Sequence, residues 1–308
     1  IKLNEVLIFH YKEQAVTSGR STRMNHSSIY LSPKFFADYL SFQQSYYLFL
    51  DIDGTLADFT MNPKDSIIPN STLMLLQKIQ SHGVKIAIVT GRSLAEAKQM
   101  LSSLSLPIAA THGLEIAFDD SSAHAKVNVV SVDMLELAEI RKSIIHSCIP
   151  FDDFTVENKP YSIALHFRKN PALADTAHTI MAESLKNHVN WILKPGKYVW
   201  EVVPKGVNKG SAILTLLKNT YRSENLCPIF IGDDITDEAG FMAVQGDSKS
   251  LEDYSPTVRG MGIKIGFEPT QANYYVRNIH EVTILLNSFL RFCQEQSERV
   301  KGEVRLRI

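Results

Sequence analysis

The segment Tyr47-Leu-Phe-Leu-Asp-Ile-Asp-Gly-Thr-Leu56 decides the fold that we expect for this chain. Its first half is a short apolar run, which is typical of a strand buried in a parallel sheet. The run ends at two carboxylates, Asp51 and Asp53, which are followed by Gly54. In an open α/β sheet, ligands bind just beyond the carboxyl ends of the strands. The segment therefore predicts acidic side chains at a ligand site, although a simple polar turn after a strand would also fit it.

Strands and helices are expected to alternate after this segment. A helix should begin after Pro69, and residues 84–90 should form a second buried strand. Ser93 can cap a helix over residues 94–104, and residues 107–113 should form a third short strand. Strand, helix, strand, helix and strand in this order predict an α/β fold: a Rossmann-like core with a parallel sheet.

The pattern changes in the middle of the chain. Two runs around 119–122 suggest a hairpin, and residues 162–168 alternate in polarity as a half-buried strand does. Further elements are expected as helices over 134–148 and 172–188 and as a strand over 198–203. These elements predict a smaller, inserted α/β domain with an antiparallel sheet.

The core pattern then returns, with a helix from Lys209, strands over 228–234 and 263–266, and a closing helix from Ala272 to about Gln296. We therefore expect a discontinuous core domain with a second domain inserted into it. The predicted divisions are a lead-in (1–45), a first core part (46–117), the inserted domain (118–201), a second core part (202–296) and a tail (297–308). Because the first methionine is Met24, we also expect residues 1–23 to be dispensable.

Composition narrows the possible functions. The chain has 308 residues, 44% of them apolar, and a formal net charge of −1. That length suits about two domains, and the charge favours neither nucleic acid nor an anionic membrane as a partner. Its three cysteines are far apart in sequence, which predicts buried free thiols in a reducing cytoplasm. No apolar stretch is long enough for a membrane span, and we expect the basic residues from Arg299 onward to be a solvated tail.

Reactive side chains follow several of the predicted core strands. The set consists of Asp51, Asp53, Thr90, Lys205, Lys209, Asp233, Asp234 and Asp237. Because parallel strands bring their carboxyl ends to one edge, these groups should converge there. Five carboxylates together need a cation, and oxygen-only ligands suit Mg²⁺. With a lysine and a threonine beside the metal, the edge predicts phosphoryl transfer. A receiver-type domain also has acids, a threonine and a lysine, but it is only about 120 residues long and has no inserted domain.

Four short motifs carry a family resemblance. Asp51-Ile-Asp-Gly-Thr55, Thr90, Lys209 and Gly232-Asp-Asp-Ile-Thr-Asp237 resemble, in order, the motifs of the haloacid dehalogenase (HAD) superfamily of phosphatases. Further segments resemble the trehalose-6-phosphate phosphatase family within it: Thr90-Gly-Arg-Ser93, His112-Gly-Leu-Glu115, Pro195-Gly-Lys-Tyr-Val-Trp-Glu201, Pro204-Lys-Gly-Val-Asn-Lys-Gly210 and Gly232-Asp-Asp-Ile-Thr-Asp-Glu-Ala-Gly-Phe241. The resemblance implies a Mg²⁺-dependent phosphatase whose substrate is a small sugar phosphate.

The resemblance also implies roles for residues of the core. Asp51 would be the nucleophile that takes the phosphoryl group, and Asp53 the general acid and then the base, with its backbone carbonyl bound to the metal. Thr90 would bind a phosphate oxygen, and Lys209, rather than Lys205, would offset negative charge. The metal ligands would be Asp51, Asp53, Asp233 and Asp234, with Asp234 and Asp237 bonding to bound water or to Lys209.

The inserted domain resembles the cap of these phosphatases, which excludes water and contacts the sugar. By resemblance, Glu157, Lys159 and Glu201 would bind glucose hydroxyls, and Arg92 and His112, on core loops that face the cap, would join them in binding the substrate. Solvated surface charges are the simpler interpretation of Glu157, Lys159 and Glu201, and a structural loop histidine is the simpler interpretation of His112. Phosphatases for sucrose phosphate or glucosylglycerate phosphate share most of these motifs, and a non-catalytic sensor could keep the fold. The resemblance implies a trehalose-6-phosphate phosphatase of the cytoplasm, and we expect a monomer.

Overall fold

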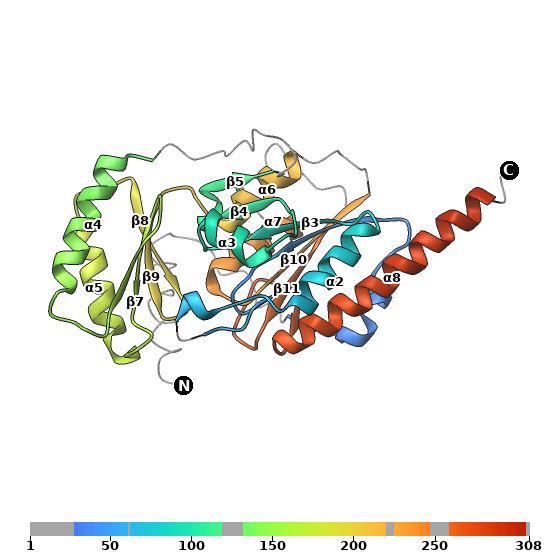
Figure 1. The fold of residues 1–308 in the computed structure, drawn as a ribbon, viewed down its shortest axis with the longest axis horizontal. Coiled ribbons are helices and arrows are strands. Elements are labelled where there is room, and N and C mark those ends of the chain that lie inside the picture. The colour runs from blue at the N-terminus through green and yellow to red at the C-terminus, as the bar shows by residue number, and fades with distance from the viewer. Residues whose placement is uncertain (1–27, 61, 119–131, 220–224, 247–258, 306–308) are drawn as a thin grey trace, which may run out of the picture.

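The computed structural model describes residues 28–60, 62–118, 132–219, 225–246 and 259–305, with side chains described up to Arg299. Figure 1 shows two bodies joined side by side, each built on its own sheet. The larger sheet has eight strands, in the order β1-β12-β11-β10-β2-β3-β4-β5. Their bounds are Ile29–Tyr30, Tyr274–Val276, Met261–Ile265, Leu226–Gly232, Ser45–Leu50, Lys85–Val89, Ile108–Ala110 and Glu115–Ala117. All neighbouring pairs are parallel except β4 and β5.

Helices cover both faces of this sheet, because its central strands are apolar on both sides. Leu48 and Leu50 of β2 belong to one apolar cluster, and Tyr47 and Phe49 belong to another on the opposite face. The first cluster includes α2 (Asn70–Ser81), α3 (Leu94–Leu101) and α8 (Ile279–Arg305), and the second includes α6 (Lys209–Lys218) and α7 (Glu238–Gln245). This three-layer arrangement confirms the predicted α/β, Rossmann-like core.

The smaller sheet is antiparallel, with the order β6-β7-β9-β8. Its strands are Thr155–Asn158, Ile163–His166, Val199–Pro204 and Trp191–Gly196. Helices α4 (Met134–Cys148) and α5 (Ala174–Ser184) lie on the face away from the core (Figure 1). Trp191 and Trp200 are buried in the apolar cluster beneath these helices.

Strand alternation decides which side chains of the smaller sheet face the core. Residues such as Leu165, Trp200 and Val202 pack on the helical side. Because neighbouring residues of a strand point to opposite faces, Lys194 and Glu201 must point the other way. The face without helices therefore carries the polar side chains toward the core.

Some predicted elements were wrong. The closing helix does not begin at Ala272, because Tyr274–Val276 form β12, and α8 begins at Ile279. The two tyrosines and the valine of β12 favour a strand, and the amphipathic pattern of α8 does not extend back to Ala272. The helix also continues through Arg305, so the expected solvated tail is helical up to that residue.

The lead-in has structure as well. Strand β1 pairs with β12 at the edge of the large sheet, and the ring of Phe36 in the 3-10 helix η1 (Pro33–Tyr39) packs at a tilt against that of Phe289 in α8. The hairpin predicted around 119–122 and the proposed start at Met24 lie outside the described residues. Strand β9 runs to Pro204, past the predicted end of the inserted domain at residue 201, and the domain boundaries remain our interpretation.

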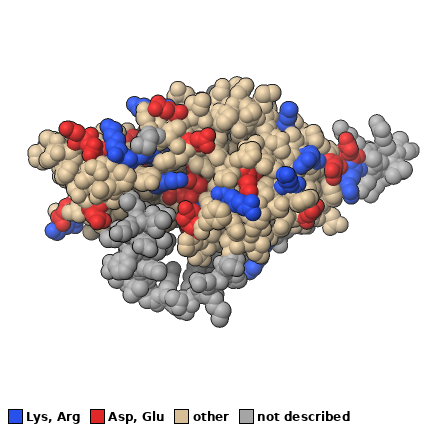
Figure 2. Space-filling view, turned by 90° about the horizontal axis from the view of Figure 1, so that it is seen from below, with Lys and Arg blue, Asp and Glu red and all other residues tan. Residues whose placement is uncertain are grey.

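The surface shown in Figure 2 mixes positive and negative side chains, in keeping with a formal net charge of −1. Among the described residues, no helix combines the length and the apolar character needed to cross a membrane.

Candidate active site

Three neighbouring strands of the large sheet deliver the central residues of the site. Asp51 directly follows β2, Thr90 follows β3, and Asp233 follows β10. Strand β2 lies between the other two and is parallel to both, with Leu50 opposite Ile231 on one side and Ile88 on the other. The carboxyl ends of the strands therefore bring Asp51, Thr90 and Asp233 to one edge, as the sequence predicts.

Lys209 lies at the centre of this edge. It is the first residue of α6, whose start is fixed by a capping box between Asn208 and Ser211. Its Nζ is 3.0 Å from Asp51 Oδ2 and 2.7 Å from Asp237 Oδ1, and its side chain is only 2% exposed. Burial alone would lower the pKa of Lys209, but Asp237 and Asp51 more than offset this, so its pKa is raised and the ammonium stays charged.

Acidic oxygens crowd around the lysine. One carboxylate oxygen from each of Asp51, Asp233 and Asp237 lies within 4.8 Å of the others. Burial raises the pKa of Asp51 well above its usual range, although Lys209 opposes this effect. Burial, together with Asp234 and Asp237, raises the pKa of Asp233 to about 7. Carboxylates this crowded favour a bound cation, and an all-oxygen ligand set suits a hard divalent ion.

Gly54 makes room for this cluster. It has a φ of +75°, and a Cβ at this position would lie 2.1 Å from Asp233 Oδ2. The backbone after β2 can therefore approach the Asp233 carboxylate closely only if it has no side chain. The ends of β2 and β10 therefore lie close enough for their carboxylates to share one metal ion.

Asp234 does not belong to the cluster in this structure. It caps the 3-10 helix η5 (Ile235–Asp237), and its Oδ2 accepts a hydrogen bond from the backbone N–H of Lys197 in the inserted domain, at 3.3 Å. Asp237, in contrast, is fully buried and pairs with Lys209. The third carboxylate of the cluster is thus Asp237 and not the predicted Asp234. The bond of Asp237 to Lys209 is one of the two contacts expected for it.

Asp53 is held by Arg92 rather than by the lysine. Arg92 donates two hydrogen bonds to the Asp53 carboxylate, of 2.7 and 2.6 Å, and a third to the backbone oxygen of Pro63 at 2.8 Å. Ser66 Oγ adds a bond of 3.2 Å to Asp53. Two parallel bonds from a planar guanidinium fix the orientation of a carboxylate. Arg92, predicted to contact the sugar, therefore orients the predicted general acid in this structure.

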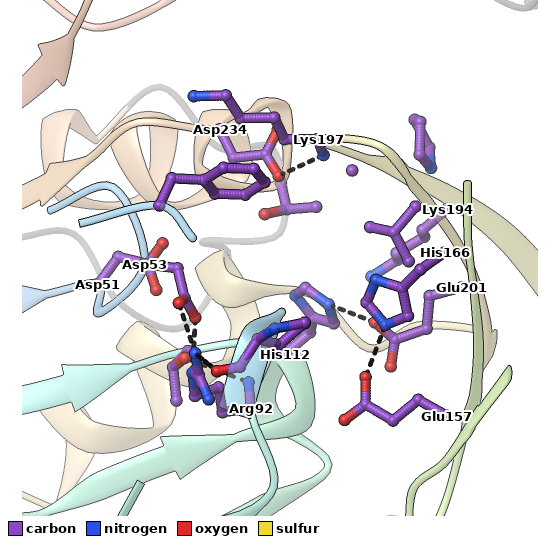
Figure 3. Close-up of a pocket in the computed structure, with 18 of the residues that line it drawn as sticks. Asp51, Asp53, Arg92, His112, Glu157, His166, Lys194, Lys197, Glu201 and Asp234 are labelled. Carbon is purple, nitrogen blue, oxygen red and sulfur yellow. Dashed lines mark hydrogen bonds and ion pairs between the residues drawn. The ribbon is translucent and has the colours of Figure 1, made fainter. Parts of the chain in front are cut away.

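The inserted domain closes the site from the other side. Figure 3 shows Asp51 and Asp53 on one wall of a cavity and Glu157, Lys194 and Glu201 on the facing wall. The cavity has a volume of about 120 Å³. It is lined by every residue that we selected for catalysis or substrate binding: Asp51, Asp53, Thr90, Arg92, His112, Glu157, Lys159, Glu201 and Lys209. Asp233 and Asp234 line it as well.

Glu201 is the best-anchored residue of the facing wall. Its Oε1 accepts hydrogen bonds from Ser162 Oγ at 2.6 Å and Lys159 Nζ at 3.1 Å, and its Oε2 lies 3.0 Å from His112 Nε2. Burial would raise the pKa of Glu201, but the charge of Lys159 and the hydrogen bonds from His112 and Ser162 more than offset it and hold this pKa well below its usual range. Lys159 also donates to the backbone oxygen of Gly91 in the core, at 2.8 Å.

Several residues of the wall were not predicted. His166 pairs with Glu157 at 2.8 Å, and the Arg168 guanidinium lies 3.9 Å from the centre of the Phe59 ring. Lys197 lies over the same ring, at 4.8 Å. The alternation of residues 162–168 could have placed His166 and Arg168 on one face of the strand. Nothing in the sequence pairs Phe59 with the two cations.

Comparison with known proteins identifies the family. A model of the trehalose-phosphatase family matches residues 49–279 of the chain. The chain belongs to the trehalose-phosphatase family.

Individual trehalose-phosphatases are also similar to this family member. The chain is 27% identical over 260 residues to trehalose-6-phosphate phosphatase of Escherichia coli, and the match covers 84% of this chain and 91% of that protein. It is 31% identical over 199 residues to a probable trehalose-phosphate phosphatase of Sinorhizobium fredii, covering 64% and 73%.

Solved structures share the fold. The C-terminal domain of C. albicans trehalose-6-phosphate phosphatase superposes with a TM-score of 0.72 at 21% identity, covering 88% of this chain and 99% of that one. A C-terminal domain of a Candida albicans trehalose synthase regulatory protein superposes with a TM-score of 0.63 at 16% identity, covering 85% and 99%. At such identities the likeness concerns the fold, so the function of this trehalose-phosphatase family member must be argued from its site.

Proposed function

We propose that this protein is a Mg²⁺-dependent phosphoric monoester hydrolase that converts trehalose 6-phosphate and water into trehalose and phosphate. The arrangement that supports this best is the buried Lys209 beside Asp51, at the end of β2 and facing the inserted domain. A receptor that only binds a sugar phosphate needs no carboxylate at the position where a phosphorus atom would be attacked. The family match supports trehalose 6-phosphate as the substrate, and the residues that line the cavity support phosphate-ester hydrolysis as the reaction.

The first chemical step forms a covalent intermediate. An oxygen of Asp51 attacks the phosphorus, and the bond from phosphorus to the sugar oxygen breaks. Lys209 holds Asp51 Oδ2 and offsets the charge that Asp51 and the phosphate bring together. Thr90, buried beside Asp51 at the end of the neighbouring strand, offers a hydroxyl to a phosphate oxygen.

The leaving group and the water need a proton carrier. Asp53 donates a proton to the departing sugar oxygen, then removes one from the water that attacks the phosphorus of the aspartyl-phosphate. Phosphate leaves, and Asp51 returns to a free carboxylate. Arg92 orients Asp53 through both carboxylate oxygens. For the acid step the Asp53–Arg92 pair must open or shift so that Asp53 can carry the proton.

Asp51, Asp233 and Asp237, together with the backbone carbonyl of Asp53, would hold the Mg²⁺. When bound, the metal polarises the phosphoryl oxygens and neutralises the charge that develops on them. On the facing wall, Glu157, Lys159 and Glu201 offer charged groups to glucose hydroxyls. We propose further that residues 118–201 act as the cap and that the enzyme works as a monomer in the cytoplasm.

Phosphate release from a panel of substrates tests this function. The panel contains trehalose 6-phosphate, sucrose phosphate, glucosylglycerate phosphate, glucose 6-phosphate and 4-nitrophenyl phosphate. We expect kcat/KM for trehalose 6-phosphate to exceed that for each other ester at least tenfold, because a site built to bond hydroxyls rejects ligands whose hydroxyls are missing or lie in other positions. EDTA should stop the reaction and Mg²⁺ should restore it. Preference for another sugar phosphate would reassign the substrate, and no release from any ester would favour a non-catalytic sensor.

A further inference from the structure

The backbone that places His112 has an unusual conformation at two successive residues. Thr111 and His112 have φ values of 47° and 57°, in the left-handed region that residues other than glycine rarely adopt. Their backbone N–H groups bond to Arg92 and Thr90 oxygens, at 2.8 and 2.9 Å. Two adjacent non-glycine residues in this region, one of them β-branched, indicate a position that the surrounding structure enforces, and such positions cluster at functional sites.

A neighbouring glycine leaves room for the histidine ring. A Cβ on Gly91 would lie 2.8 Å from His112 Cε1 and 2.9 Å from its Nε2. The ring thus lies directly on the backbone of the loop that follows β3, where a larger residue would displace it. The Gly91 oxygen binds Lys159 of the inserted domain. Gly91 therefore supports both the core residue and the inserted-domain residue that reach Glu201.

The ring joins the two bodies through one carboxylate oxygen. His112 Nε2 lies 3.0 Å from Glu201 Oε2, whereas Lys159 and Ser162, both of the inserted domain, bond to Oε1. A carboxylate only accepts hydrogen bonds, so Nε2 carries the proton. Burial lowers the pKa of His112, against the effect of Glu201, and keeps the ring neutral. Its Nδ1 has no hydrogen-bond partner among the described residues, and the ring lines the cavity.

Neutrality of the ring matters for the charge balance. Lys159 and Glu201 already form a compensated buried pair. A neutral donor on Oε2 fixes the carboxylate without adding charge to the site. If that donor is removed, Oε2 remains buried without a partner, and the carboxylate can turn away or draw in water.

We propose that His112 is a positioning residue: from the core it fixes the Glu201 carboxylate across the cavity in the orientation that recognises the sugar. This inference rests on the proposed function, in which Glu201 faces the sugar hydroxyls. A substrate without a sugar gains little from an ordered Glu201. His112 therefore contributes to selectivity for a sugar-bearing ester over a small one.

The test compares kinetics on trehalose 6-phosphate and 4-nitrophenyl phosphate. His112→Ala should raise KM for trehalose 6-phosphate about tenfold with a much smaller change in kcat, the effect of one hydrogen bond to a charged group. Its loss of kcat/KM on the small ester should be several-fold weaker. His112→Gln, which keeps an amide donor, should recover part of the loss. This variant also keeps the test informative if His112→Ala does not fold.

A double-mutant cycle separates positioning from direct contact. If His112 acts through Glu201, His112→Ala in a Glu201→Gln background should cost little more than Glu201→Gln alone. Losses that multiply would mean that His112 contacts the substrate by itself, and equal losses on both esters would mean a general structural role. Either result would overturn the inference.

The chain offers a matched control. His188 Nδ1 lies 3.0 Å from Glu136 Oε1, a pair of the same length on the far side of the inserted domain. His188→Ala should leave the kinetics on both esters unchanged. A wild-type protein that hydrolyses the small ester but not trehalose 6-phosphate would refute the proposed substrate. In that case the cycle is run on the sugar phosphate that the enzyme accepts, so the two failures are distinguishable.

Discussion

Replacing Lys209 with methionine should remove the positive charge at the centre of the site while roughly keeping the volume of the side chain. The ammonium is 3.0 Å from Asp51 and 2.7 Å from Asp237, and its side chain is 2% exposed. Breaking a buried ion pair costs about 3–5 kcal/mol, because the remaining charge is left without a partner. We therefore expect the free energy of unfolding of Lys209→Met to fall by about that amount at neutral pH without metal.

The loss should depend on pH and on metal. Burial raises the pKa of Asp51, and without Lys209 opposing it this pKa would rise further. A carboxyl whose folded pKa is raised stabilises the fold at low pH, and this stability is lost as pH rises through the folded pKa. The gap between variant and wild type should therefore be smaller at pH 5 than at pH 8. Mg²⁺ should narrow it at pH 8, because a cation can replace the missing charge.

Urea denaturation followed by circular dichroism measures both effects, with unfolding free energies obtained by linear extrapolation. Lys205→Met is the matched control, since Lys205 is four positions away and exposed. The control should change stability by less than about 0.5 kcal/mol. Turnover of Lys209→Met should also fall about 10²–10³-fold, the usual cost of losing one charge-stabilising group. If Lys209→Met is no less stable than Lys205→Met, Lys209 does not form the buried ion pairs with Asp51 and Asp237.

Three further predictions concern Arg92, Lys194 and two buried cysteines. Arg92→Lys keeps the charge but loses the two-bond contact with Asp53, so kcat should fall about tenfold; steady-state kinetics will show whether charge alone suffices. Burial lowers the pKa of Lys194 to about 8. Between pH 8 and about 10.5 the unfolded chain keeps this proton longer than the folded protein does, so the stability of the wild type relative to Lys194→Met should rise over that range in urea titrations. Burial raises the pKa of Cys227 to about 11 and of Cys293 to about 12, so neither thiol should be alkylated by iodoacetamide at pH 8 until the protein is denatured.

The core could be predicted because its strands are continuous apolar runs that end in polar groups. Asp51, Thr90 and Asp233 each follow such a run, and parallel pairing then brings them together. Strand β12 was missed because a strand of three residues before a long amphipathic helix gives too short a pattern to separate from it. The three buried cysteines were predicted correctly as free thiols.

The sequence predicts which residues lie at the site, but it does not predict which of them form hydrogen bonds and ion pairs with one another. Sequence could not decide between Asp234 and Asp237, because the turn of η5 points one into the core and the other toward Lys197. It also could not show that Arg92 binds Asp53, since both residues suit a ligand equally well. Contacts between segments far apart in sequence, such as His112 with Glu201, depend on how the two bodies pack against each other.

The most direct test of the account asks whether trehalose 6-phosphate transfers its phosphoryl group to Asp51. The protein is mixed with trehalose 6-phosphate and Mg²⁺, and the reaction is quenched in acid within the first turnover. The protein is then digested for peptide mass spectrometry, and the released trehalose is quantified. We predict the added mass of one phosphoryl group on Asp51, a matching amount of trehalose, and no trehalose release by Asp51→Asn. Continued release of trehalose by Asp51→Asn would contradict the account.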